Sequence, residues 1–120
     1  MAASSSSPSQ AALSDADYHR IASAVLARIE QRVDELLQAD VIDIDAMRVG
    51  GLLELEFPGG GKIVVNLQPP LHELWLAARA GGYHFRFDGQ RWIDRDGNEL
   101  FALLSARAGE QAGKPLQFTP

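Results

Sequence analysis

Carboxylate side chains crowd into one stretch of this chain, and their density favours binding of cations. Half of the sixteen acidic residues fall between residues 30 and 56, where only Arg32 and Arg48 oppose them. Exposed carboxylate oxygens attract hard metal ions and basic protein surfaces. We therefore expect a solvated acidic ridge that serves one or both purposes, formed by Glu30, Asp34, Glu35, Asp40, Asp43 and Asp45.

The spacing of these acids places like charges close together, and their repulsion suggests that the arrangement serves a function. Glu30 and Asp34 are one turn apart on a predicted helix, and Asp43 and Asp45 share one face of a predicted strand. Each such repulsion costs a few tenths of a kcal/mol. The alternative is a solvated face that only keeps the protein in solution. In water an exposed carboxylate attracts a cation by about 1 kcal/mol at roughly 4 Å, so binding should be weak and sensitive to salt.

The composition narrows the classes of function. A net charge of −5 argues against nucleic acid as a partner, because its phosphates attract basic proteins. No apolar run has the length of about 20 residues that a membrane-spanning helix needs. Without cysteine there is no thiol nucleophile and no thiolate metal ligand, which suits the cytoplasm. Motifs typical of hydrolases and nucleotide-binding enzymes are missing, so we do not expect an enzyme.

The apolar pattern predicts the elements that carry these acids. Residues 1–13 are rich in Ser and Ala and lack the features of a targeting signal, so we expect a disordered extension. A helix-like period from Asp15 to Gln38, with Ser14 or Asp15 as cap, predicts a long amphipathic helix. Alternating patterns then predict a first strand from residue 42 to at least 45, whose continuation past Ala46 the pattern leaves open. Further strands are predicted at residues 53–57, 63–67, 72–77, 83–87 and 91–94, followed by a second helix capped by Asn98. Residues 116–118 could pair briefly or lie along the helices.

This order predicts an α+β fold, a two-layer sandwich in which two helices cover one face of an antiparallel sheet of about six strands. The other face must then meet water, and it carries a large aromatic residue, Trp75. Trp75 could be half covered by its cross-strand neighbours, but an exposed tryptophan is also typical of a binding hot spot. We expect a partner-binding face formed by Asn66, Gln68, Glu73, Trp75 and Arg86, with His84 beside them.

Two long segments resemble the frataxin family, whose bacterial members are the CyaY proteins. NLQPPLHELWLA (residues 66–77) is similar to the central motif of the family, and GGYHFRFDGQRWIDRDGNELFALL (residues 81–104) continues the likeness. The opening SDADYHRIASAVLARIEQRVDEL resembles the first helix of the bacterial proteins. The resemblance implies a frataxin-like domain over residues 14–120. One departure is Glu73, which stands where the family usually has Gln.

The resemblance also implies a function. It implies a non-catalytic monomer that binds ferrous or ferric iron weakly through the acidic ridge and docks on the complex of cysteine desulfurase and iron–sulfur scaffold. Asp15 and His19 could add a second iron site, although a capping or solvated histidine is an equal alternative. Two other functions stay open: a ferroxidase or iron-storage protein, and an interaction module whose acids recognise only a protein.

Overall fold

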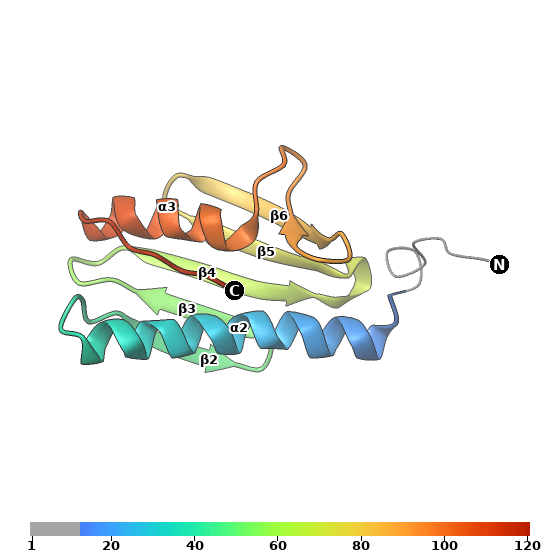
Figure 1. The fold of residues 1–120 in the computed structure, drawn as a ribbon, viewed down its shortest axis with the longest axis horizontal. Coiled ribbons are helices and arrows are strands. Elements are labelled where there is room, and N and C mark those ends of the chain that lie inside the picture. The colour runs from blue at the N-terminus through green and yellow to red at the C-terminus, as the bar shows by residue number, and fades with distance from the viewer. Residues whose placement is uncertain (1–12) are drawn as a thin grey trace.

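The computed structural model describes residues 13–120, and the predicted extension over residues 1–13 lies outside this part except for Leu13, which packs against the core. The elements in chain order are α2 (Asp15–Gln38), β2 (Asp45–Val49), β3 (Leu52–Glu56), β4 (Lys62–Gln68), the 3₁₀ turn η1 (Pro69–Leu71), β5 (Glu73–Ala78), β6 (Gly81–Phe87), β7 (Trp92–Ile93) and α3 (Leu100–Ala112). Within residues 13–120 the strands form one six-stranded antiparallel sheet in sequential order. Figure 1 shows α2 and α3 running along the sheet.

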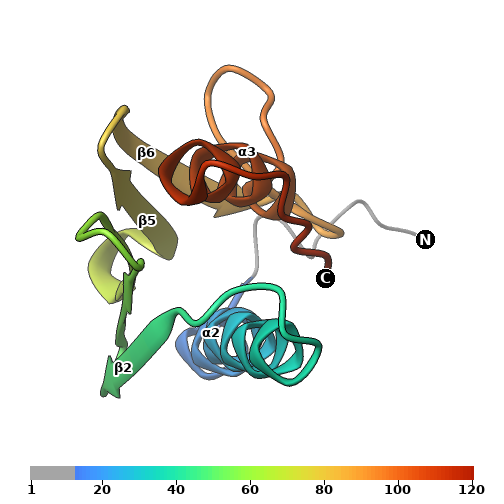
Figure 2. The same cartoon turned by 90° about the vertical axis from the view of Figure 1, so that its left-hand side faces the viewer.

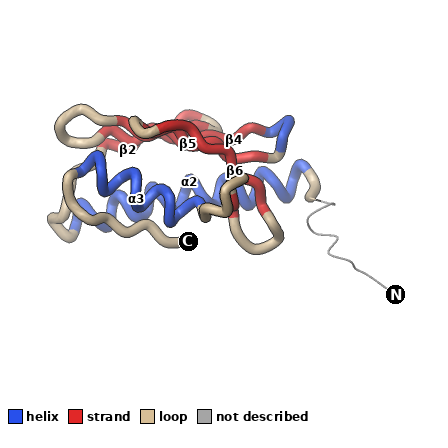
Figure 3. The backbone as a smooth tube through the Cα atoms, turned by 90° about the horizontal axis from the view of Figure 1, so that it is seen from above, coloured by secondary structure: helices blue, strands red, loops and turns tan. Residues whose placement is uncertain are grey.

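Both helices lie on the same face of the sheet, as Figures 2 and 3 show, so the predicted two-layer α+β sandwich is confirmed. Alternate side chains of each strand point into the layer between helices and sheet, because successive side chains of a strand point to opposite faces. This layer is the core. Its fully buried members include Tyr18, Leu26, Ile29, Leu53, Leu55, Ile63, Leu74, Leu76, Phe85, Leu100, Leu104 and Phe118.

The first helix begins as the sequence predicts. The Ser14 hydroxyl accepts a hydrogen bond from the backbone N–H of Asp17 at 3.0 Å, which makes Ser14 the N-cap. The expected cap of the second helix, Asn98, is wrong. Glu99 caps α3 by accepting from the N–H groups of Phe101 and Ala102, whereas Asn98 donates to Asp94.

The predicted start of the first strand at residue 42 is also wrong, because the strand begins at Asp45 and runs to Val49. Asp45 faces Glu56 in the β2–β3 ladder. Two residues earlier the ladder would place Asp43 opposite Pro58, which has no N–H to donate. Ile44 is still buried, but as a residue of the connection rather than of the strand.

The predicted sixth strand is shorter than expected, and the fourth begins one residue later. Pro69 and Pro70 form the η1 turn, and His72 follows in the left-handed conformation with φ of 53°. Residues 116–118 lie along the helices, with Leu116 and Phe118 buried. In the described residues no helix is long and apolar enough to cross a membrane.

Candidate functional site

The residues predicted for partner binding share the outer face of the sheet, away from the helices. Asn66, Trp75 and His84 face one another across β4, β5 and β6, and Gln68, Glu73 and Arg86 form the next row. Two rows of the same register therefore bring together all of the predicted residues: Asn66, Gln68, Glu73, Trp75, His84 and Arg86.

Glu73 organises this face. The residue is only 8% exposed, yet both carboxylate oxygens are bonded: Oε1 accepts from Nε1 of Trp75 at 2.8 Å, and Oε2 accepts from Nε of Arg86 at 2.9 Å. Burial raises the pKa of Glu73, but these two hydrogen bonds and the positive charge of Arg86 outweigh it and leave the pKa below its ordinary value. A glutamine could keep the bond from Trp75 but not the charge that holds Arg86.

Trp75 is fixed from two sides. Its ring lies parallel to the imidazole of His84, with ring centroids 3.9 Å apart and an interplanar angle of 6°. The indole N–H is engaged by Glu73, and the ring is half-buried on the outer face. The alternative of a Trp covered by cross-strand neighbours is therefore partly correct. A fixed, half-exposed aromatic ring loses little conformational freedom when a partner covers it.

Tyr18 on α2 locks the strand ends that position these residues. Its buried hydroxyl donates to the carbonyl of Glu73 at 2.6 Å and accepts from the N–H of Gln68 at 2.9 Å. The hydroxyl therefore bridges β4 and β5 on either side of η1. Burial raises the pKa of Tyr18, while the N–H of Gln68 opposes that change.

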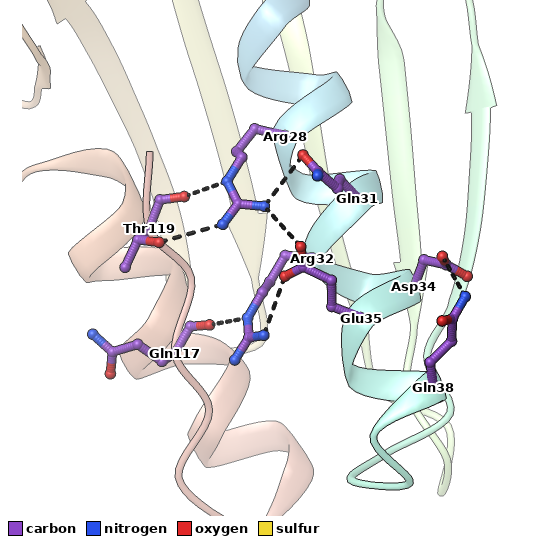
Figure 4. A network of polar contacts seen from close by, with 8 residues as sticks. All are labelled: Arg28, Gln31, Arg32, Asp34, Glu35, Gln38, Gln117 and Thr119. Carbon is purple, nitrogen blue, oxygen red and sulfur yellow. Dashed lines mark hydrogen bonds and ion pairs between the residues drawn. The ribbon is translucent and has the colours of Figure 1, made fainter.

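The predicted acidic ridge separates into parts. Glu30 forms an ion pair with Arg48 of β2 at 2.9 Å, so one carboxylate is already neutralised. Glu35 lies beside Arg32 at 3.3 Å and Arg28 at 3.8 Å, on the side of α2 that faces the C-terminal tail. Figure 4 shows that Asp34 and its partner Gln38 lie on a different side of the helix from Glu35.

Three acids of the predicted ridge have no hydrogen-bond or ion-pair partner for their side chains among residues 13–120, and we call Asp40, Asp43 and Asp45 the acidic segment. All three are exposed. Glu56, which faces Asp45 across the β2–β3 ladder, adds a carboxylate that the prediction omitted. In the described part of the chain no three His, Cys, Asp or Glu side chains converge as a metal-binding group.

Asp15 and His19, predicted as a second iron site, lie one turn apart on α2 and form no hydrogen bond with each other among residues 13–120. The Oδ1 atom of Asp15 lies 2.6 Å from Nε2 of His72, and the His72 ring stacks on Tyr18 at 4.9 Å. His19 is exposed and meets the edge of the same tyrosine ring. The role of His72 was missed because its approach to Asp15 depends on the η1 turn, which the strand prediction did not contain. The contact of His84 with Trp75 could be predicted from the sequence. Trp75 lies three residues before Ala78 and His84 lies three residues after Gly81, and Ala78 faces Gly81 at the end of the β5–β6 hairpin.

Comparison with known proteins agrees with this fold. The family model of the frataxin-like domain matches residues 11–114. A protein of Variovorax paradoxus named "Iron-sulfur cluster assembly protein CyaY" is 50% identical over 107 residues, covering 88% of this chain and 97% of its own. A protein of the same name from Cupriavidus taiwanensis is also 50% identical over 107 residues, covering 88% and 96%.

Solved structures extend the likeness. Frataxin from Psychromonas ingrahamii superposes with a TM-score of 0.79 at 34% identity, covering 88% of this chain and 98% of that one. A trimeric frataxin from the yeast Saccharomyces cerevisiae, complexed with ferrous iron, has a TM-score of 0.66 at 30% identity, covering 78% and 86%. The antiparallel sheet with two helices on one face thus defines a frataxin-like domain. This chain belongs to the frataxin family.

Proposed function

We propose that this protein acts in iron–sulfur cluster assembly as a non-catalytic, iron-binding regulator or iron donor that docks on the cysteine desulfurase complex. The proposal is supported by relatives that carry the assembly name and are 50% identical over nearly their whole length. It is also supported by the yeast frataxin structure with ferrous iron. We place this activity in the cytoplasm.

The observation that carries the iron-binding part is the acidic segment. Asp40, Asp43 and Asp45 are exposed and uncompensated within residues 13–120, while the other candidate acids on α2 are bonded to Arg or Gln side chains. Carboxylate oxygens are suitable ligands for iron. Because no three ligands converge in the described residues, the iron should bind as exchangeable cargo held by the field of several carboxylates.

The same geometry weighs against a ferroxidase. Di-iron chemistry in helical proteins uses bridging carboxylates that project from facing helices into a closed site. The acidic segment lies on the connection after α2 and at the start of β2, and its three residues are exposed to water. Oxygen consumption with ferrous iron in a stopped-flow instrument would separate the two functions. Saturable turnover would favour the enzyme.

The partner-binding part is supported by the outer face. Trp75 is held flat by Glu73 and His84, and Asn66, Gln68 and Arg86 surround it with polar groups. Such an arrangement of one aromatic anchor and a polar rim is typical of protein interfaces. We propose that this face meets a second surface of the assembly complex while the acidic segment engages a basic one.

Matched substitutions of equal charge test the proposal. One variant changes Asp40, Asp43 and Asp45 to Asn; the control changes three exposed acids elsewhere, Asp17 and Asp96 to Asn and Glu110 to Gln. Anaerobic calorimetry with ferrous iron should show that only the first variant loses the heat of iron binding. The dissociation constant of that variant for the desulfurase complex should rise by at least about tenfold. Equal effects of both variants would show that only net charge matters, and no effect of either would refute the proposal. If the wild type binds iron but does not bind the desulfurase complex, only the docking part of the proposal is refuted.

A further inference from the structure

The two edges of the sheet are protected very differently. The β7 edge is two residues long, and it is followed by a bridge between Ile93 and Glu99. The β2 edge is five residues long and contains neither Pro nor Lys, two residues that proteins commonly use to block edge pairing. Its register against β3 runs without a bulge from Asp45 to Val49.

The hydrogen bonds of β3 reveal which backbone groups of β2 are open. Phe57 donates to the carbonyl of Gly61, and Leu67 donates to the carbonyl of Gly51, so odd-numbered positions of this strand bond toward β4. Its even-numbered positions therefore bond toward β2, where they face Asp45, Met47 and Val49. It follows that Ala46 and Arg48 direct their N–H and C=O groups away from the sheet.

The side chains along this edge are unusually apolar for an exposed strand. Met47 is 58% exposed and Val49 is 69% exposed, and Leu52, which faces Val49, is 40% exposed. These three residues lie on the outer face, since Leu53 and Leu55, which alternate with Leu52 and Glu54 along β3, point into the core. We call Met47, Val49 and Leu52 the apolar strip.

Charge at the edge selects the kind of strand that fits. The acidic segment leads into β2, and Asp45 faces Glu56 on the outer face. Two bases near these acids are already paired, Arg48 with Glu30 on the helix side and Lys62, which faces Glu56 in the β3–β4 ladder, with Glu54. An added strand should therefore present apolar side chains to the strip and basic side chains to the acids. A second copy of this chain would bring the same carboxylates, so like charges oppose self-pairing.

We infer that β2 is a docking edge that accepts an extended segment of another protein, apolar in its centre and flanked by Lys or Arg, as an added strand of the sheet. Main-chain hydrogen bonds to Ala46 and Arg48 give such a complex its affinity, and the strip and the acids give its specificity. The inference goes beyond the proposed function, because strand addition needs neither bound iron nor the Trp75 face.

A synthetic peptide tests the edge directly. The probe is acetyl-Lys-Thr-Val-Thr-Val-Thr-Lys-amide, which carries its Val and Lys side chains on one face and reads the same in both directions, so that it fits a parallel or an antiparallel strand. Its control is the same peptide methylated at every backbone nitrogen, which keeps the charge and removes the N–H donors. Binding is measured by calorimetry, and protection of individual amides by hydrogen exchange.

The expected result has two parts. The amides of Ala46 and Arg48 should gain protection when the probe is bound, and methylation should weaken binding by at least about tenfold. On the protein, Ala46→Pro removes an outward N–H and should weaken binding similarly, whereas Ala46→Val keeps the N–H and should bind like wild type. If Ala46→Pro does not fold, the methylated peptide still decides.

Several results would overturn the inference. Equal affinity for both peptides would show attraction by charge alone, and absence of binding or of amide protection would show that the edge does not accept a strand. Sedimentation that shows a dimer of the wild type and a monomer of Ala46→Pro would identify the occupant as a second copy. If the wild type binds no ferrous iron but still binds the probe with protection of Ala46 and Arg48, the proposed function fails while this inference is supported.

Discussion

The indole of Trp75 and the imidazole of His84 lie parallel across β5 and β6, with their ring centroids 3.9 Å apart. Glu73 holds the indole N–H from the neighbouring row, so the ring has one fixed orientation on the outer face. A partner that covers Trp75 therefore meets a surface that is already ordered. This arrangement depends on a buried carboxylate, and the carboxylate can be tested through pH.

The substitution Glu73→Gln should flatten the dependence of stability on acid pH. The pKa of Glu73 is lowered in the folded protein, so its ionised form contributes stability that is complete above the unfolded value near 4.5 and is lost as the pH falls through the folded pKa. Glutamine does not titrate and should remove that part of the slope. Urea unfolding between about pH 3 and pH 7 measures it.

The control for this measurement is Glu110→Gln, which changes an exposed acid paired with Arg107. Asp94 stays in both variants. Burial raises its pKa, but hydrogen bonds from Asn98 and Asp96 outweigh burial and leave the pKa lowered in the fold. Each variant should therefore keep some dependence of stability on acid pH. Parallel profiles of wild type and Glu73→Gln would contradict the prediction. They would show that the bonds to Trp75 and Arg86 do not favour the ionised form.

The substitution Tyr18→Phe should lower the free energy of unfolding by about 1–3 kcal/mol, because it leaves the carbonyl of Glu73 and the N–H of Gln68 without their partner. Tyr83→Phe is the control: its hydroxyl has no hydrogen-bond partner among residues 13–120, so its effect should stay within about 0.5 kcal/mol. Chemical denaturation measures both. Equal losses would show that the hydroxyl bridge at η1 contributes nothing of its own.

The sequence predicts the fold well because its signals are local. Apolar periodicity is strong in α2, and the hairpin between Gly50 and Gly51 follows directly from the glycine pair. The core residues of β3 and β4 follow from alternation alone. The start of β2 could not be predicted, since it depends on Pro58 of a later turn standing opposite the predicted strand.

The candidate site was predictable in part for the same reason. Cross-strand rows follow from the hairpin turns, so Asn66, Trp75 and Arg86 were placed on one face correctly. The acidic ridge could not be predicted as correctly, because a run of acids in the sequence does not reveal which of them will pair with an arginine from another part of the chain. Arg48 reaches Glu30 across the fold, and Arg28 and Arg32 reach Glu35 while they hold the tail.

The tail offers a prediction about stability. Arg32 donates to the carbonyl of Gln117 at 2.7 Å, and Arg28 donates to the carbonyl of Thr119 at 2.9 Å, while Phe118 is buried between these positions. Figure 4 shows both arginines on the tail side of α2. Phe118→Ala should cost about 3–5 kcal/mol and Arg32→Ala about 1–2 kcal/mol.

The matched control is Arg20→Ala, since Arg20 forms only an exposed pair with Asp17 and should cost less than about 1 kcal/mol. Thermal or urea unfolding compares the three variants. If Arg32→Ala were as mild as Arg20→Ala, the bond from Arg32 to the tail would contribute nothing measurable to stability. Glu35→Gln should then also be silent.

The ion pair between Arg48 and Glu30 leads to a prediction of increased iron binding. Arg48→Gln frees the Glu30 carboxylate and removes a positive charge three residues from Asp45, so the field at the acidic segment becomes more negative. One exposed charge at roughly 4 Å contributes about 1 kcal/mol in water, which corresponds to about fivefold in affinity. Anaerobic calorimetry with ferrous iron at low salt should show this gain, and the gain should shrink as salt is added, because exposed charges are screened. Arg20→Gln makes the same change in net charge by freeing Asp17, which lies near the other end of α2. A gain of equal size in Arg20→Gln would show that iron responds to total charge, and no gain in Arg48→Gln would show that Glu30 lies outside the iron-binding surface.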